Sequence, residues 1–338
     1  MRCVALFSGG LDSQLATRLM QQQGIEVEGA HVATVYAPCE PRTVAAAQHL
    51  GIRLHQLAVG PDYLEVLERP RFGYGKGANP CIDCRIYMAK MAAGLMPQID
   101  AHFVVTGEII GQRPMSQKRR DLDIVAHHSG LDDLLLRPLS AKLLPATYPE
   151  RQGWVDRSRL HGFSGRRRYD LAQLATALGL TEIPQPSTGC ALTDKLFGVK
   201  AFDLLNTTAS KTLWDFQSLR VGRHFRFQPD CKVIVGRDQT ENAQLRDLHD
   251  AADARSTALL EPHDFLGPTV LIVGPATESA REYAGGLALR YARNKRGEHH
   301  QIQILDADGS RRFAAHTTPD SENAMPLGAQ TPRPTEPC

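Results

Sequence analysis

The stretch CVALFSGGLDSQLATRLM, residues 3–20, decides the fold of the amino-terminal half of the chain. It starts as an apolar run over 3–7, and a helical pattern follows over 15–24, with SGGLDS at 8–13 between them. Glycine has no Cβ atom, so the backbone of this segment can approach bulky oxygens closely. The first N–H groups of a helix are unpaired and carry the positive end of its dipole. The stretch therefore predicts a strand, a turn and a helix that together bind a phosphate group.

Short apolar runs separated by helical patterns continue along the chain to about residue 180. The further strands that we expect cover 27–36, 53–59 and 102–108, with a short apolar element at 134–140. The further helices that we expect cover 43–51, 82–96 and 170–180. Parallel strands need crossover connections of this kind, usually helices. The sequence therefore predicts an α/β fold with a doubly wound parallel sheet.

The pattern changes near residue 205. Strand-like pieces at 223–227, 232–236 and 269–274 alternate with helical patterns at 240–253 and 279–296. From residue 317 the chain is polar and rich in proline, which is typical of disorder. We therefore expect three parts: an α/β domain over 1–205, a second, smaller α+β domain over 206–316 and a disordered tail over 317–338.

Composition excludes several classes of protein. Of the 338 residues, 42% are hydrophobic and 22% are charged, and the net charge is +2, all ordinary values for a globular chain. No apolar run approaches the roughly 20 residues that span a bilayer, and the first residues lack the form of a signal peptide. We therefore expect a cytoplasmic protein with no membrane partner. The chain has seven cysteines, and this odd number with one tight pair favours a metal or redox site over a disulfide framework.

Three motifs together resemble one group of enzymes. SGGLDS matches the SGGxDS signature of the PP-loop ATP pyrophosphatases and lacks the spacing of a Walker A loop. NPCIDC at 79–84 and STGC at 187–190 resemble cysteine segments of the tRNA 2-thiouridine synthetases, although STGC lacks one residue that this family places before its cysteine. The resemblance covers roughly residues 1–205. It implies that ATP is cleaved between its α and β phosphates to give an adenylated intermediate.

The resemblance also implies the site residues. It assigns sulfur transfer to Cys84 and Cys190, and we expect Asp12 to organise Mg²⁺ or phosphate. VVTGE at 104–108 resembles the threonine and glycine that end a strand in these enzymes. The predicted ATP-binding residues are Ser8, Gly9, Gly10, Asp12, Ser13, Thr34, Thr106 and Gly107.

Cys81 is a departure, because many 2-thiouridine synthetases have no cysteine at this place. Cys81, Cys84 and Cys190 give a C-x2-C pair with one distant cysteine, which resembles thiolation enzymes that hold a 4Fe–4S cluster on three thiolates. Three protein ligands leave one iron open to exogenous sulfide. Two alternatives stay open: persulfide or disulfide chemistry at the cysteines, and a zinc site that takes a fourth ligand from elsewhere.

Basic stretches lie at 112–120, 164–170 and 292–296. Lysine and arginine supply most non-specific affinity for nucleic acids because they neutralise phosphates. Residues 221–245 also resemble the RNA-binding domain of the NFACT ribosome-quality-control proteins, which implies RNA contacts by Arg223, His224, Arg226 and Arg237. The residues predicted to bind RNA are Arg113, Lys118, Arg119, Arg120, Arg166, Arg167, Arg223 and Arg237.

These observations favour an ATP-dependent tRNA thiouridine synthetase that adenylates a uridine oxygen and replaces it with sulfur, giving 2-thiouridine at the wobble position. Its cofactors would be ATP, Mg²⁺ and a 4Fe–4S cluster, and its partners would be tRNA and a sulfur donor, either sulfide or a persulfide carrier. One alternative is 4-thiouridine synthesis at tRNA position 8. Two others are a non-catalytic RNA- or ribosome-binding protein with a vestigial nucleotide site and a PP-loop enzyme that acts on a small molecule. A homodimer through the second domain also stays open.

Overall fold

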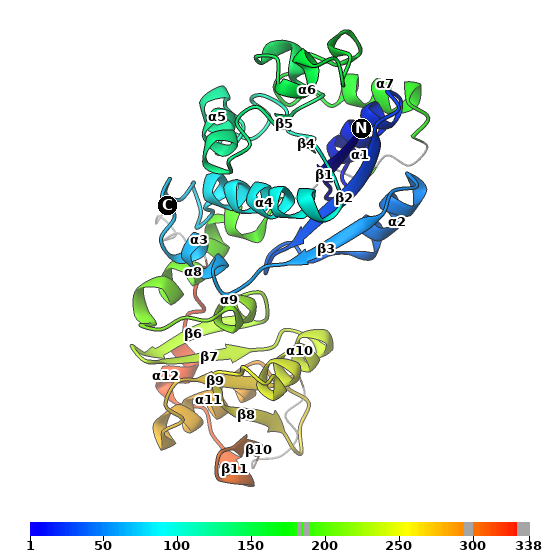
Figure 1. Ribbon diagram of the computed structural model, residues 1–338. Coiled ribbons are helices and arrows are strands. Elements are labelled where there is room, and N and C mark those ends of the chain that lie inside the picture. Colours follow the sequence, from blue (N-terminus) through cyan, green and yellow to red (C-terminus); the bar gives the residue numbers. More distant parts are fainter. Residues whose placement is uncertain (181–183, 185–188, 294–299, 330–338) are drawn as a thin grey trace, which may run out of the picture. The chain divides into compact units, whose positions relative to one another are not determined.

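A parallel sheet of five strands forms the centre of the amino-terminal half of the protein in a computed structural model, which describes residues 1–180, 184, 189–293 and 300–329 (Figure 1). Its strands are β1 (Arg2–Leu6), β2 (Glu26–Ala33), β3 (Leu54–Ala58), β4 (Phe103–Thr106) and β5 (Leu135–Leu136). They lie in the order β3-β2-β1-β4-β5, and each neighbouring pair is parallel. The chain thus builds one side of β1 first and then crosses to the other side. This topology confirms the predicted doubly wound sheet.

Helices connect these strands and cover the sheet. They are α1 (Leu11–Gln21), α2 (Pro41–His49), α3 (Tyr63–Glu68), α4 (Cys81–Leu95), α5 (Arg119–His128), α6 (Tyr148–Arg151) and α7 (Tyr169–Ala177), with 3-10 turns η1 (Met96–Gln98), η2 (Ala141–Leu143) and η3 (Arg157–Arg159). The predicted helices correspond to α1, α2, α4 and α7. Sequence analysis did not predict α5, because its start lies in a run of exposed basic residues. Its inward face buries Leu122, Val125 and Ala126.

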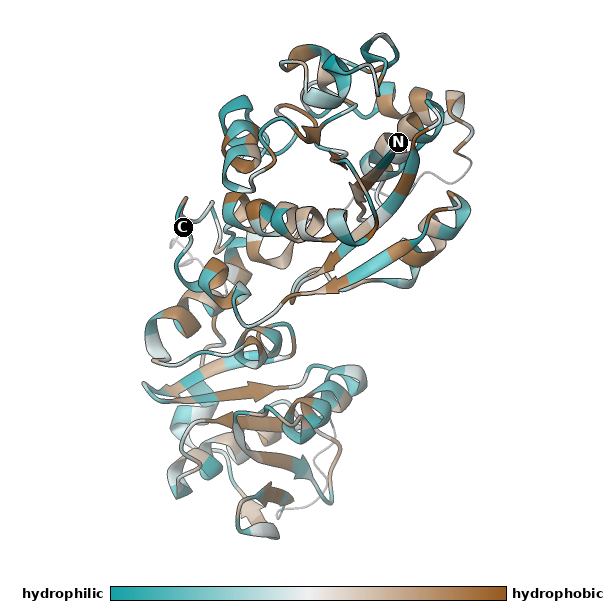
Figure 2. Cartoon of the chain, viewed as in Figure 1, coloured by the Kyte–Doolittle hydropathy of each residue, from teal (hydrophilic) through white to brown (hydrophobic). Residues whose placement is uncertain are grey.

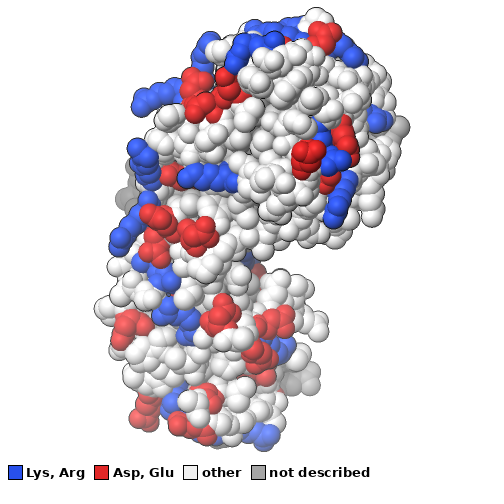
Figure 3. Space-filling view, in the orientation of Figure 1, with Lys and Arg blue, Asp and Glu red and all other residues white. Residues whose placement is uncertain are grey.

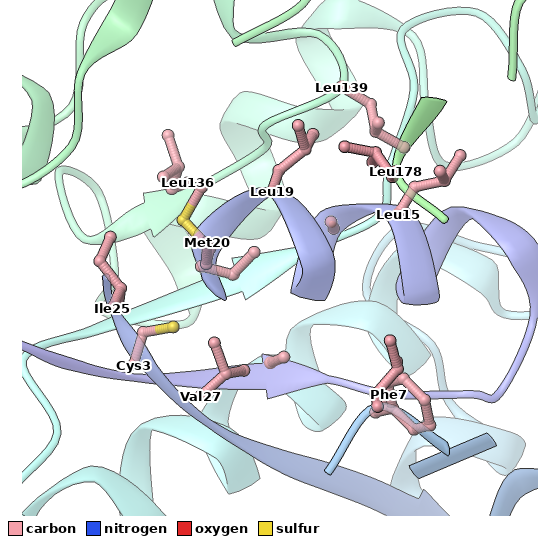
Figure 4. Packing of buried hydrophobic residues seen from close by; sticks show 14 of the residues in the cluster. Cys3, Phe7, Leu15, Leu19, Met20, Ile25, Val27, Leu136, Leu139 and Leu178 are labelled. Atoms are coloured by element: carbon pink, nitrogen blue, oxygen red, sulfur yellow. The ribbon is translucent and has the colours of Figure 1, made fainter. Parts of the chain in front are cut away.

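The two faces of β1 explain why its residues 3–6 are all apolar. Cys3 and Ala5 face the helix α1, and Val4 between them packs with residues of α4. Figure 4 shows Leu19 and Met20 of α1 over this face of the sheet. Cys3 is fully buried there, as a small hydrophobic residue would be. A strand that is covered on both sides reads as a continuous apolar run.

An antiparallel sheet of six strands forms the centre of the second unit. Its strands are β6 (Arg223–Gln228), β7 (Cys231–Val235), β8 (Ser256–Pro262), β9 (Val270–Val273), β10 (His300–Asp306) and β11 (Gly309–Ala315), in the order β11-β10-β8-β9-β7-β6. The helical elements are η4 (Ala191–Thr193), α8 (Lys195–Thr207), α9 (Leu213–Ser218), α10 (Gln239–Asp250), α11 (Glu278–Arg290) and α12 (Pro319–Asn323). The predicted α+β class of this part is confirmed.

Both faces of this second sheet carry helices. On one face Val233 and Val235 of β7 pack with Leu287 of α11. On the other face Ile234 packs with Trp214 of α9 and with a leucine of α10. Hydrophobic colouring accordingly runs through the central strands β7 and β9 (Figure 2). Successive side chains of β7 therefore point to opposite faces of the sheet, with the period of two that defines a strand.

The boundary between the two units lies earlier than residue 205. The first unit contains Met1–Gly75 and Asn79–Cys190, and the second contains Lys76–Ala78 and Ala191–Cys338. Helix α8 belongs to the second unit because its side chains reach β6 and the turn before it. Lys200 donates to the carbonyl oxygen of Gly222 over 3.1 Å, and Asp203 accepts from Arg226 over 3.2 Å.

Part of the predicted disordered tail is ordered, so that prediction is wrong for residues 317–329. Helix α12 packs against α11, and Ser321 is fully buried. Arg290 donates to the carbonyl oxygens of Ser321 and Ala324, over 3.0 and 2.6 Å. The Leu327 amide donates to the carbonyl oxygen of His224 over 2.7 Å. The remaining tail, 330–338, lies outside the described residues.

Of the helices that the structure describes, none is both long enough and apolar enough to cross a bilayer.

Gly107, directly after β4, provides a test of the packing between β4 and α1. A Cβ atom on Gly107 would lie 2.4 Å from the carbonyl carbon and oxygen of Asp12, so it would force the two elements apart. We expect Gly107→Ala to lower the free energy of unfolding by about 1–3 kcal/mol in urea titrations, the usual effect of overpacking. Gly94→Ala is the matched control, because Gly94 is an exposed position of α4 where a Cβ atom would meet nothing within 4 Å. It should raise stability by roughly 0.5–1 kcal/mol, and equal effects of the two substitutions would contradict the assignment.

Candidate functional site

The loop between β1 and α1 is braced through its carbonyl groups. Thr43 Oγ1 donates to the carbonyl oxygen of Ser8 over 3.2 Å, Gln14 Nε2 to that of Gly9 over 2.8 Å, and Ser13 Oγ to that of Gly10 over 2.8 Å. Gly9 has a φ of +72°, and a Cβ atom there would lie 2.8 Å from Thr43 Cα. Within the described chain, no side chain caps the first turn of α1. Its first N–H groups are therefore available to an anion.

This loop lies at the point where the order of the strands in the sheet reverses. The chain leaves β1 toward β2 and later returns to add β4 on the other side. Ligands of open α/β sheets bind outside the carboxyl ends of the strands at such a point. Gly107 contacts the backbone of Asp12 there, and Ser8 Oγ lies 3.4 Å from Ser13 Oγ. Of the predicted ATP-binding residues, all but Thr34 thus belong to this loop, the start of α1 or the end of β4.

Asp12 is surrounded by positive charge. Gln112 Nε2 donates to Asp12 Oδ2 over 2.9 Å. Burial raises the pKa of Asp12, while the Gln112 hydrogen bond and the charges of Arg113, Arg168 and Arg85 offset part of this shift. A carboxylate that is short of water can hold Mg²⁺, which prefers oxygen ligands, and the arginines suit the phosphates of a nucleotide.

A buried ion pair joins the ends of β4 and β5. Arg137 Nε donates to Glu108 Oε2 over 3.0 Å, and both side chains are almost fully buried. Arg137 also donates to the carbonyl oxygen of Leu122 over 2.9 Å, and Arg85 Nε of α4 lies 3.8 Å from Glu108 Oε1. Sequence reasoning missed these residues. The signal that could have found Arg137 is a lone charge within the apolar run at 134–140.

Cys81 and Cys84 lie in the first turn of α4. Their spacing of three residues places them on the same side of the helix. Asn79 Nδ2 donates to Cys81 Sγ over 3.1 Å, and Tyr63 Oη lies 3.2 Å from Cys84 Sγ. Burial raises the pKa of the Cys84 thiol, and the Tyr63 hydrogen bond and the charge of Arg85 counteract that rise. Thr34, predicted to bind ATP, is buried near Tyr63, whose pKa it lowers slightly against the effect of burial.

Cys190 is brought to the same neighbourhood as the other two cysteines. The charges of Asp12, Cys81 and Cys190 all act on Arg113. Those of Cys84 and Cys190 both act on Tyr63. Ser187 and Thr188, the first residues of the STGC motif, lie outside the described residues. The fold thus places the predicted phosphate loop and the predicted sulfur-transfer cysteines around one arginine.

The predicted cluster site is not formed as a coordination group. Among the residues that the structure describes, there is no set of three or more His, Cys, Asp or Glu side chains that could hold a metal ion. Three thiols are a chemically suitable donor set for iron, but although they lie in one neighbourhood, the described side chains do not form a coordination set. The zinc alternative fails the same test of geometry, because a structural zinc site needs four ligands.

Two of the predicted RNA-binding stretches meet beside Asp12. The Gly165 amide donates to the carbonyl oxygen of Ile110 over 2.7 Å, and Arg166 Nε donates to that of Gln112 over 3.2 Å. These bonds join 164–170 to the loop that carries Gln112 and Arg113. The basic residues predicted there are all exposed, namely Arg113, Lys118, Arg119, Arg120, Arg166 and Arg167.

The basic residues of the second unit have other partners. Arg223 lies over the ring of Tyr291 at 4.6 Å, and Arg237 Nε donates to Glu241 over 2.8 Å. His224 is fully buried, so its predicted RNA contact is wrong. In the face of this unit that Figure 3 shows, acidic side chains lie among the basic ones. Of the basic stretch 292–296, only the first two residues are described.

The sheet topology, with a glycine loop where the strand order reverses, defines a doubly wound α/β fold. Residues 1–142 match the family described as thiamine biosynthesis protein (ThiI), and residues 222–325 match the NFACT protein RNA binding domain. Both resemblances predicted from the sequence are confirmed by these matches. Each family matches within one of the two units.

Curated relatives match the first unit. A probable tRNA sulfurtransferase of Thermococcus kodakarensis is 30% identical over 142 residues, which are 41% of this chain and 36% of the relative. A tRNA-specific 2-thiouridylase MnmA of Sulfurimonas denitrificans is 33% identical over 116 residues, 30% of this chain and 33% of the relative. The chain therefore spans about a third of the length of the relatives it matches.

Two solved structures are similar at a lower level. A 4-thiouridine synthetase in complex with RNA and ATP has a TM-score of 0.35 and 20% identity, covering 54% of this chain and 42% of that chain. A predicted subunit of tRNA methyltransferase from Methanocaldococcus jannaschii has a TM-score of 0.35 and 14% identity, covering 52% and 76%. Since both scores are low, the assignment of the fold depends on the sheet topology.

Asp12→Asn tests the balance of burial and charge at the candidate site. The pKa of Asp12 is raised in the folded protein, so ionisation of this group lowers stability as the pH rises above 3.8, its ordinary pKa. We therefore expect the Asp12→Asn variant to be more stable than the wild type at neutral pH. The difference should vanish below that ordinary pKa, where both folded and unfolded Asp12 are protonated. Urea unfolding over a pH series measures this.

Asp133→Asn is the control with the opposite sign. Asp133 accepts from Arg151 Nη2 over 2.6 Å, and this bond lowers the pKa of Asp133. Its ionised form therefore favours folding, and the variant should be slightly less stable than the wild type at neutral pH. A destabilised Asp12→Asn variant would instead mean that the arginine charges outweigh burial at Asp12.

Proposed function

We propose that the protein is an ATP-dependent sulfurtransferase that activates a uridine of tRNA and exchanges one of its oxygens for sulfur. The observation that supports this proposal is that the charges of Asp12, Cys81 and Cys190 all act on Arg113, so the residues that would bind phosphate and those that would carry sulfur lie near one side chain. The match of residues 1–142 to the ThiI family and the relatives named as tRNA sulfurtransferase and 2-thiouridylase support it.

In the activation step, a carbonyl oxygen of the uridine attacks the α-phosphorus of ATP. The bond from this phosphorus to the bridging oxygen breaks, and pyrophosphate leaves with the electron pair. The N–H groups at the start of α1 would bind the phosphates, and Asp12 would hold Mg²⁺. Arg85, Arg113 and Arg168, whose charges already act on Asp12, would stabilise the negative charge that develops.

In the sulfur step, a sulfur nucleophile attacks the activated carbon, and AMP leaves with the former uridine oxygen. The nucleophile is sulfide, or the terminal sulfur of a persulfide on Cys84 or Cys190. In the persulfide case the second cysteine then attacks the carrier sulfur, which releases the thiouridine and leaves a disulfide. Adenylation is required because an oxide is a poor leaving group and AMP is a good one.

A 4Fe–4S cluster is a second way to deliver sulfur, and we retain it as a proposal on the chemistry of the three thiols. Cys81, Cys84 and Cys190 would hold it, and such a cluster would offer one iron to an exogenous sulfide. No step above depends on it.

For the position of the modification, we propose the 2-position of the wobble uridine, with the 4-position of uridine 8 as the alternative. The paired cysteine motifs and the 2-thiouridylase relatives support the first, and the ThiI match supports the second. We also propose that tRNA contacts the exposed basic residues of 112–120 and 164–167, which meet beside Asp12. The second unit would add affinity, because residues 222–325 match an RNA-binding domain.

Mass spectrometry of tRNA nucleosides tests the function directly. Purified protein with ATP, Mg²⁺, sulfide and unmodified tRNA should form one thiouridine together with AMP and pyrophosphate, and the product identifies the ring position. With a persulfide donor in place of sulfide, Cys84→Ala and Cys190→Ala should lower this rate by about 10³-fold or more, the scale for removing a member of a nucleophilic site. Cys39→Ala, a half-exposed cysteine outside these motifs, is the control. If the wild type binds tRNA but forms neither AMP nor thiouridine, the RNA-binding alternative is correct.

Iron content separates the two routes for sulfur. Anaerobically purified and reconstituted protein should hold about four irons per chain if the cluster forms, and Cys81→Ala should lose them. Without a cluster, iron stays near zero, and persulfide-carrying peptides that contain Cys84 or Cys190 should appear after incubation with a persulfide donor. Bound zinc instead of iron would contradict both routes.

A further inference from the structure

Gln112 is bonded both to the candidate nucleotide site and to a basic stretch of the surface. Its side-chain Nε2 donates to Asp12 Oδ2 over 2.9 Å, and its carbonyl oxygen accepts from Arg166 Nε over 3.2 Å. Asp12 and Gln112 are half-buried, whereas Arg166 is exposed. All three residues belong to the first unit. One residue thus lies between an exposed arginine and the carboxylate beside the glycine loop.

Backbone hydrogen bonds hold the turn that carries Gln112. The Gly111 amide donates to the carbonyl oxygen of Gln117 over 2.7 Å, and the Gln112 amide donates to that of Ile109 over 3.1 Å. Ile109 and Gln117 are almost fully buried. The turn is therefore anchored in the interior on both sides, and the Gln112 side chain reaches Asp12 from a fixed backbone.

Arg166 belongs to a segment that is bonded to the same turn. The Ile110 amide donates to Ser140 Oγ over 3.1 Å, and Ser140 Oγ donates to the carbonyl oxygen of Phe163 over 2.7 Å. Ser140 is fully buried, so this link lies inside the unit. The Gly165 amide also donates to the carbonyl oxygen of Ile110 over 2.7 Å. The backbone beside Arg166 is therefore held against the turn, and the arginine bond adds to an existing connection.

The bond from Gln112 is of the kind that orients a metal-binding carboxylate. A hydrogen bond to one carboxylate oxygen fixes the direction in which the other oxygen meets a metal ion, and removing such a partner usually lowers metal affinity or activity about 10–100-fold. Gln112 donates to Oδ2 of Asp12 and thereby orients Oδ1.

Arg166 can receive a second, stronger partner. A phosphate group binds a guanidinium by charge-assisted hydrogen bonds, which are roughly twice as strong as bonds between neutral groups. A tRNA phosphate at Arg166 would fix a side chain that is exposed in the free protein. Because Arg166 donates to the carbonyl oxygen of Gln112, this ordering would extend to the carboxylate of Asp12.

We propose that Gln112 and Arg166 are positioning residues, with Gln112 orienting the Asp12 carboxylate for Mg²⁺ and Arg166 coupling tRNA binding to that orientation. Bound tRNA then raises the affinity for Mg²⁺ and ATP, and the nucleotide raises the affinity for tRNA by the same factor, as linkage requires. We expect a factor of about ten, within the usual range for coupled sites. The inference rests on the proposed function for the identity of both ligands.

Nucleotide binding to the full chain tests the proposal without turnover. The probe is Mg²⁺ with α,β-methylene-ATP, which cannot be cleaved between its α and β phosphorus atoms, titrated calorimetrically with and without saturating unmodified tRNA. Gln112→Leu should lower the affinity without tRNA about 10–100-fold. Arg166→Ala should lower it by less and abolish the gain from tRNA, and Arg166→Lys, which keeps a charged donor, should restore part of that gain.

A double variant and a matched control exclude a merely structural role. If Arg166 acts through the Gln112 side chain, Gln112→Leu combined with Arg166→Ala should bind the nucleotide as Gln112→Leu does. Arg159→Ala is the control, because Arg159 is also exposed and donates to a backbone carbonyl oxygen, that of Gln22, over 2.9 Å. It should keep both wild-type affinities. Additive effects in the double variant, or a gain from tRNA that persists in Arg166→Ala, would overturn the proposal.

Thiolation assays separate this proposal from the proposed function. If the variants change nucleotide binding as expected but the wild type forms no thiouridine, the coupling is correct and the thiolation function is wrong. If thiouridine forms and Arg166→Ala keeps the full gain from tRNA, the function is correct and Arg166 does not couple the sites. A wild type that binds no nucleotide contradicts both. The coupling also predicts a higher KM for ATP in Arg166→Ala with little change in kcat.

Discussion

The close approach of Gly107 to the backbone of Asp12 is the constraint on which the candidate site depends. It joins the end of β4 to the start of α1, where any side chain would separate them. The loop that follows β4 is thereby held beside the glycine loop between β1 and α1. Glu108 enters its ion pair with Arg137, and Gln112 reaches the Asp12 carboxylate. One glycine thus determines where the polar groups of two loops meet.

At this edge of the sheet, two arginines link the carboxylate of Asp12 to the three cysteines. Arg85 extends from the helix that begins with the cysteine pair, and its charge acts on both Asp12 and Cys84. Arg113 does the same for Asp12, Cys81 and Cys190. A substrate that is activated beside Asp12, as proposed, would therefore lie near the thiols that would carry sulfur.

Much of the fold followed from local sequence pattern, because apolar periodicity and glycine position are local properties. The strand at 3–7 and the SGGLDS turn were predicted since both are determined within a few residues. Tyr63 and Arg85 could not be predicted, because their roles depend on partners brought together by tertiary packing. Helix α5 was not predicted because it begins in a run of basic residues. Helix α12 was not predicted because prolines surround it. The domain boundary was misplaced because the anchoring of α8 to β6 by Asp203 leaves no signal near residue 205.

The pairing of β1 with β4 has a consequence for how the site comes into being. Cys3 lies opposite Phe103, so one hundred residues separate strands that are neighbours in space. Contacts of such large sequence separation form late, because the entropy of closing the loop is lost before they give stability. While only β1 to β3 have paired, the glycine loop exists without Gly107, Gln112 or Arg113 beside it. The full set of polar groups beside the glycine loop should therefore form late in folding, together with the docking of β4.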